Sequence, residues 1–171
     1  MAYSVVPKTR RDGKITLRDA TNPTPVSLEV QFEEGNLSIE KPNEYSSLVI
    51  RDRGDISAVR KQDQGIITGS FAFNLRQFTD ASEAGSIIDF IEKDGFYSSN
   101  VSTGAAGTPY VEQYAIDIVY DVEGTDHGDD ADCSATLSKC IVDSYSVSEG
   151  DPTSVTINFS CYGGVTYSGP A

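Results

Sequence analysis

Several residue types that often carry function are scarce in this sequence of 171 residues. It contains no tryptophan and a single histidine, His127. It has no apolar run long enough to span a membrane. In the N-terminal stretch MAYSVVPKTRRDG the charges follow a short apolar segment, which is the reverse of a secretory signal. The sequence therefore predicts neither a membrane partner nor export through a signal peptide.

Motifs for catalysis and cofactor binding are absent as well. The sequence has no nucleophile elbow, phosphate-binding loop, dinucleotide fingerprint or zinc motif. Its three cysteines, Cys133, Cys140 and Cys161, include no CxxC pair, and Cys161 continues the apolar face of a predicted strand. We therefore expect thiols in a reducing compartment that serve as small apolar residues. No enzyme, catalytic residue or cofactor is predicted.

Basic residues are also few. The 13 Lys and Arg residues face 26 Asp and Glu residues, which gives a net charge of −13. Binding nucleic acid by neutralising its phosphates needs a basic surface, and this balance of charge excludes it. Two interpretations of the acidic surface stay open: it is simply solvated, or it keeps polyanions from adhering.

The acidic residues are densest in the segment Asp121–Asp132, which reads DVEGTDHGDDAD. Clustered carboxylates are typical calcium ligands, and the candidates here are Asp126, Asp129, Asp130 and Asp132. Their spacing does not match the DxDxDG loop with its distal glutamate. An acidic turn between two antiparallel strands is therefore favoured over a metal site.

Most of the chain shows the alternation of apolar and polar residues that indicates strands with one buried face. The strands predicted in this way are Lys14–Arg18, Ser27–Glu33, Asn36–Glu40, Tyr110–Val122, Ala135–Val147 and Thr153–Tyr162. The tight connection Glu34-Gly35 predicts a hairpin over Val26–Glu40. Residues 163–171 are expected to form a flexible tail.

The stretch from Gly65 to Gly95 changes its period. Its first half predicts a strand whose core-facing residues are Ile67, Phe71, Phe73 and Leu75. Its second half predicts a helix whose apolar stripe is made by Ile87, Ile88, Phe90 and Ile91. The helix is capped either by the pair Asp80 and Glu83 or by Ser86. Gly95 is expected to take the left-handed position at its end.

Residues 41–64 form a segment of high charge density. Leu48–Ile50 are expected to form a short apolar core of the segment, and Ile56 with Val59 a second one. Its charges alternate in sign: Arg51, Asp52, Arg53, Asp55, Arg60, Lys61 and Asp63. The segment is predicted to be either a solvated hairpin or long loop, or an arm whose mixed charges pair with another subunit.

These patterns predict a single, mainly β domain over residues 1–171. Its strands would form a β-sandwich or partly closed barrel of about seven or eight antiparallel strands, with one inserted α-helix covering an open edge or end. Exposed edge strands must be protected or used. One use is to continue the sheet into a neighbouring subunit.

The order of elements resembles that of the major tail tube proteins of long-tailed, non-contractile bacteriophages. It comprises the predicted hairpin Val26–Glu40, the charged arm Lys41–Gln64, the strand and helix of Ile66–Lys93, and the long hairpins of Tyr110–Tyr162. The most characteristic piece is GSFAFNLRQFTD followed by a short helix. The resemblance covers nearly the whole chain and implies a structural subunit, related in fold to the inner tubes of contractile tails and of the type VI secretion apparatus.

The resemblance also implies an assembly within the virion. Hexameric rings, formed in the cytoplasm of the host bacterium, would stack into a tube with a continuous inner barrel, alongside a tape-measure protein and other tail proteins. DNA would pass through without specific binding, and an acidic lumen suits this because it repels a polyanion. The expected inter-ring contacts are Arg51, Asp52, Arg53, Asp55, Arg60 and Lys61, and the expected lumen-lining residues are Asp117 and Asp121.

Alternatives from two classes stay open. Another β-rich virion or secretion component, such as a tail terminator, a capsid decoration protein or a type VI-like inner tube, fits the same composition. A calcium-dependent carbohydrate-binding module would instead use the segment Asp121–Asp132, to which the resemblance gives no role.

Overall fold

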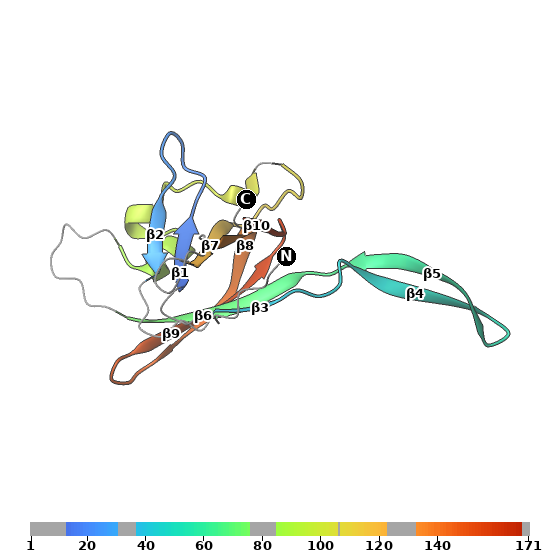
Figure 1. Ribbon diagram of the computed structural model, residues 1–171. Helices are drawn as coiled ribbons and strands as arrows, with labels where there is room; N and C mark the ends of the chain where they lie inside the picture. Colours follow the sequence, from blue (N-terminus) through green and yellow to red (C-terminus); the bar gives the residue numbers. More distant parts are fainter. Residues whose placement is uncertain (1–12, 31–36, 76–84, 106, 123–132, 169–171) are drawn as a thin grey trace.

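The computed structural model describes residues 13–30, 37–75, 85–105, 107–122 and 133–168. These residues form ten strands, one α-helix and two short 3-10 helices (Figure 1). Their bounds are β1 Gly13–Arg18, β2 Ser27–Val30, β3 Ser38–Glu40, β4 Tyr45–Asp52, β5 Asp55–Gln64, β6 Ile67–Asn74, α1 Ile87–Glu92, η2 Gly95–Tyr97, η3 Thr103–Ala105, β7 Ile116–Val122, β8 Cys133–Ser148, β9 Ser154–Cys161 and β10 Val165–Ser168.

Eight of the strands form one antiparallel sheet. Its order is β2-β1-β7-β8-β9-β6-β3, and β10 pairs with β8. The two end strands, β2 and β3, do not pair with each other, so the described strands form an open sheet and not a closed barrel. The predicted mainly β, antiparallel fold with one inserted α-helix is confirmed.

The predicted hairpin over Val26–Glu40 is wrong. Strand β2 pairs with β1, where Val30 lies opposite Ile15, and β3 pairs with β6, where Ser38 lies opposite Ser70. The two strands therefore lie at opposite ends of the sheet order. Alternation shows that a strand has one buried face, but it does not say which strand lies beside it. The turn residues on which the prediction depended fall in 31–36, outside the described residues.

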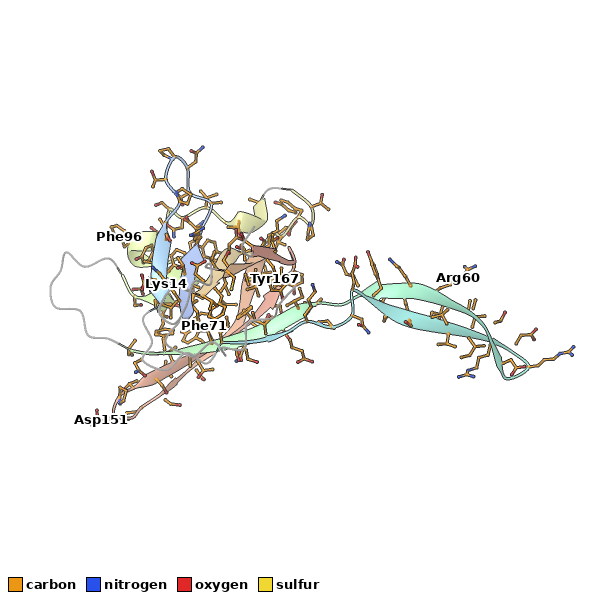
Figure 2. All side chains as sticks on the ribbon, viewed as in Figure 1. Lys14, Arg60, Phe71, Phe96, Asp151 and Tyr167 are labelled. Carbon is orange, nitrogen blue, oxygen red and sulfur yellow. The ribbon has the colours of Figure 1, made fainter. Side chains whose placement is uncertain are left out.

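A single apolar core holds the sheet and the helix together. It joins β1, at one side of the sheet, to β9 and β6 at the other (Figure 2). The rings of Phe71 and Phe159 lie 6.1 Å apart in this core, and Ile15, Leu17 and Ile157 are fully buried in it. The other side chains of this cluster that lie wholly inside are Phe90, Ile118, Leu137, Cys140 and Val155. Burial of this extent is the main source of stability for the fold.

Helix α1 packs into the apolar core through the buried Phe90. Its first turn matches one of the two predicted caps. The Asp89 N–H donates to Ser86 Oγ over 3.1 Å, and the Ser86 N–H donates to Asp89 Oδ2 over 2.7 Å. This reciprocal capping box confirms Ser86 as the cap. The alternative pair, Asp80 and Glu83, lies outside the described residues.

The end of α1 differs from the prediction. The left-handed residue that ends the helix is Lys93, with a φ of 57°, and not Gly95. Gly95 also has a positive φ of 53°, but it opens η2, where its N–H donates to Asp94 Oδ1 over 2.7 Å. The capped turn η2 follows α1 directly. The helix therefore ends at Lys93, two positions before Gly95.

Two cysteines behave as the sequence predicts. Cys140 of β8 lies directly opposite Cys161 of β9, and both are buried in the core. A hydrogen bond to the Cys161 thiol, together with burial, raises the pKa of Cys140. Both side chains therefore serve as small apolar residues of the core.

The predicted tail 163–171 contains a strand. Residues Val165–Ser168 form β10 on β8, where Val165 lies opposite Leu137. The chain turns into β10 at Gly164, whose φ of 86° favours glycine. Residues 169–171 lie outside the described residues.

Candidate assembly surfaces

Strands β4 and β5 form a two-stranded sheet of their own, here called the arm (Tyr45–Gln64). Figure 1 shows this ribbon projecting from the rest of the described chain, here called the body, with β3 and β6 leading to its base. In Figure 2 the side chains around Arg60 stand clear of the body, whereas those around Phe71 are crowded. The charged segment is thus a hairpin, which is one of the predicted alternatives.

The tip of the arm is a tight two-residue turn. Asp52 lies opposite Asp55, and the intervening Arg53 and Gly54 have φ values of 49° and 96°. Two positive φ angles are typical of a type I′ turn, which matches the twist of the strands it joins. Arg51 Nη1 donates to the Gly54 carbonyl over 3.2 Å, which closes the tip further.

The base of the arm is a close backbone crossing. The Gly65 N–H donates to the Glu44 carbonyl over 3.0 Å. A Cβ at Gly65 would lie 2.6 Å from the carbonyl oxygen of Asn43, so only glycine fits there without a shift of the backbone. Just beyond, Lys61 Nζ lies 4.4 Å from the centroid of the Tyr45 ring. These contacts fix the ribbon where it leaves the body.

The residues predicted to contact another ring all lie on this arm. Arg51, Asp52, Arg53 and Asp55 gather at the tip, and Arg60 and Lys61 lie nearer the base on β5. The structure brings them together on one projecting element. Their contact with another subunit stays a prediction.

The apolar residues of the arm are the feature that the sequence interpretation missed. It treated them as a small core of the segment, but they are exposed: Leu48 by 46%, Val49 by 42%, Ile50 by 39%, Ile56 by 60% and Val59 by 59%. No third strand or helix covers them among the described residues. A cluster of exposed aliphatic side chains is typical of a surface that another molecule covers.

A second open surface is the far half of β8, residues Ile141–Ser148. Strand β7 pairs with β8 only up to Cys140, so among the described strands this half has β9 as its single neighbour. Tyr145 lies opposite the buried Ile157, and Val147 lies opposite the buried Val155, yet their own exposures are 41% and 51%. The core-facing side of the sheet therefore runs out to an unpaired edge that is still apolar.

Helix α1 reaches this edge through one polar contact. Tyr145 Oη donates to Glu92 Oε1 over 2.7 Å. This hydrogen bond raises the pKa of Tyr145, because the phenol that donates it must stay protonated. Among the described strands, none pairs with residues Ile141–Ser148 on the side opposite β9.

The two predicted lumen-lining carboxylates lie on β7, and both are half-buried. Asp117 has a structural partner, because the Lys139 N–H donates to its Oδ1 over 2.9 Å at a bulge of β8. Asp121 lies in register with Lys14 and Ser134. Whether these side chains face a lumen stays a prediction.

The calcium candidates Asp126, Asp129, Asp130 and Asp132 fall in 123–132, outside the described residues. In the part of the chain that the structure describes, no group of three His, Cys, Asp or Glu side chains is placed to hold a metal ion. No helix in that part is long and apolar enough to cross a membrane.

Comparison with known proteins finds similarity in structure alone. No family profile and no curated protein sequence matches the chain. A chain of the PVC sheath-tube complex, from an extracellular contractile injection system, has a TM-score of 0.60 at 11% identity, over 97% of this chain and 94% of its own. The sheath/tube terminator of that system gives 0.58 at 13% identity, over 96% and 99%.

A third similar structure is the SPP1 tail tube, with a TM-score of 0.57 at 10% identity, over 96% of this chain and 80% of its own. Similarity at this level of identity shows the fold. Contractile injection systems and a phage tail tube share it, so it does not separate the contractile from the non-contractile class. The chain has the fold of the tail tube and tube terminator proteins of phage-like systems.

Proposed function

We propose that this chain is a structural subunit of a phage tail tube, in which hexameric rings stack into a conduit for DNA. The observation that carries the proposal is the pair of open surfaces in a fold shared with tube proteins. The apolar edge of β8 and the uncovered arm both lack a partner among the described residues. A ring uses one surface to join subunits side by side and the other to join one ring to the next.

In this proposal the edge of β8 pairs with a strand of the neighbouring subunit, which continues the sheet around the ring. The neighbouring subunit then covers Tyr145 and Val147. The residues opposite them on β9, Ile157 and Val155, are already buried. The arm contacts the next ring, with Arg51, Arg53, Arg60 and Lys61 facing acidic groups. The chain is not an enzyme and needs no cofactor.

The net charge of −13 suits the same role. A lumen rich in carboxylates repels the phosphates of DNA, so that the genome slides through without binding. Asp117 and Asp121 are the proposed lumen-lining residues. The protein would assemble in the host cytoplasm with a tape-measure protein, and it would reside in the tail of a non-contractile virion.

A second candidate is a tube terminator, because the similar structures include a sheath/tube terminator and a tube-terminating cap. A terminator forms rings but does not propagate a tube. Other components with this fold, such as the inner tube of a type VI-like apparatus, would stack as a tail tube does.

Electron microscopy of concentrated, purified protein tests the proposal. Hollow tubes of constant diameter are the expected result, and six-fold ring averages would support the ring number. Single rings that never stack would favour the terminator. A strictly monomeric protein at every concentration would contradict both.

A further inference from the structure

The arm is apolar on both of its faces. Residues directly opposite each other in an antiparallel pair point to the same side, and successive residues point to opposite sides. Val49 lies opposite Val59, and both lie on the first face. Leu48 lies opposite Arg60, and Ile50 lies opposite Ala58; these four form the second face.

The exposure on the two faces is similar. Val49 and Val59 of the first face are exposed by 42% and 59%, and Leu48 and Ile50 of the second by 46% and 39%. A sheet that docks through one side has one apolar face and one polar face. A two-stranded ribbon is marginal in water by itself. An arm with aliphatic side chains on both faces therefore needs cover on both faces.

Charge indicates what covers it. Residues 45–64 hold four of the chain's 13 Lys and Arg residues but only three of its 26 Asp and Glu residues. The arm is thus slightly positive, while the remainder of the same chain has 14 more acidic than basic residues. Each face also bears a basic side chain near the base: Lys61, opposite Ser47, on the first, and Arg60 on the second. The remainder of this chain is therefore opposite to the arm in net charge, which favours a second copy of the chain as the partner of both faces.

We propose that the arm inserts into the seam between two neighbouring copies of this chain, so that each copy covers one face. This inference rests on the proposed function, because it requires stacked rings. A closed ring has one seam for each subunit, and the next ring brings one arm for each subunit, so every arm meets one seam. The seam supplies two acidic walls, and the ribbon becomes the middle layer between them.

Accessibility of the two faces tests this directly. The variants Val49→Cys and Ile50→Cys place a thiol on adjacent residues that point to opposite faces. Both are made in a Cys133→Ser background, where the native Cys140 and Cys161 are buried and do not react. Both new thiols should react rapidly with a maleimide in dispersed subunits. In tubes, both reaction rates should fall by about tenfold or more. Slowing at one position alone would overturn the inference.

A crosslinking experiment counts the chains around one arm. A doubly substituted Val49→Cys, Ile50→Cys subunit carries a photoreactive maleimide at both positions and is assembled with a large excess of unlabelled wild-type subunits. If the arm inserts into the seam, the doubly labelled subunit should give a product of three chains on a denaturing gel. Each singly labelled variant should give a product of two chains. Products of two chains alone from the doubly labelled subunit would contradict the seam.

The two experiments separate this inference from the proposed function. Wild-type protein that forms no rings or tubes would contradict the proposed function itself. Tubes that form normally, with one arm face still reactive or with a single chain crosslinked, would refute insertion into the seam. They would not contradict the proposed function. Melting curves of the dispersed variants check that they fold, which is expected because both positions are exposed.

Discussion

The body and the arm are built from the same secondary structure, yet they are stabilised in different ways. In the body, strands from both sides of the sheet bury one continuous core in which Ile157 and Phe71 are almost wholly enclosed. In the arm, comparable aliphatic residues remain exposed, and Ile56 keeps 60% of its surface in contact with solvent. The body therefore buries a core of its own within a single chain, whereas the arm does not.

This difference indicates where the sequence encodes a fold and where it encodes an assembly. The body's apolar residues stabilise the subunit through its own core. The arm has good local geometry, with a type I′ turn at its tip and a close glycine crossing at its base, but it lacks a core. Its shape is specified by the chain, and its stability is expected to come from other copies.

The largest expected effect comes from a matched pair of isoleucines. Ile157→Ala leaves a cavity in the body and should lower the free energy of unfolding of the dispersed subunit by about 2–5 kcal/mol. Ile56→Ala removes the same atoms from the arm and should change it by no more than about 0.5 kcal/mol. Chemical denaturation of both variants measures the two values. Equal losses would mean that the arm is part of the subunit's own core.

A smaller effect is expected at the cap of α1. Ser86→Ala removes the acceptor for the Asp89 N–H and should cost about 1 kcal/mol of stability. Ser86→Asp, which keeps an acceptor at this position, is the matched control and should restore most of the loss. Because the cap belongs to the body, tube formation by either variant should match the wild type once the subunit is folded. A cap variant that folds normally but fails to assemble would place α1 in an interface.

The smallest effect on stability is expected for charge reversal at the tip of the arm. Arg51→Glu combined with Arg53→Glu should shift the unfolding free energy of the dispersed subunit by at most about 0.5 kcal/mol. The same change should reduce stacking of rings, as seen by sedimentation and microscopy, because like charges would then meet the acidic next ring. Arg51→Lys with Arg53→Lys retains the charge and should stack. Normal tubes from the Arg51→Glu, Arg53→Glu variant would show that these arginines do not contribute to the contact between rings.

Local features of the body were predictable from sequence, and pairing was not. The alternation in Ile67–Asn74 and the signal at Ser86 identified β6 and α1, since both depend on a few adjacent residues. The partners of β2 and β3 were predicted incorrectly, because sheet order depends on contacts far along the chain. Strand β7 begins at Ile116 and not at Tyr110, since Ser102 Oγ accepts the Ala115 N–H over 2.9 Å and holds the preceding residues against a loop.

The candidate surfaces show the same limit. The charges of the arm were visible as a run in the sequence, and the structure places all of them on one projecting ribbon. The exposure of Leu48 and Val59 was not predictable, because an apolar residue in a strand is normally covered by its own chain.

Hydrogen exchange of backbone amides tests the central claim most directly. In dispersed subunits, amides of the β8–β9 ladder should be protected while those of Tyr45–Gln64 exchange rapidly. In assembled tubes, the amides of the arm should become protected to a similar degree as the ladder. An arm as protected as the ladder in the dispersed subunit, or one still unprotected in the tube, would contradict the account that further copies complete it.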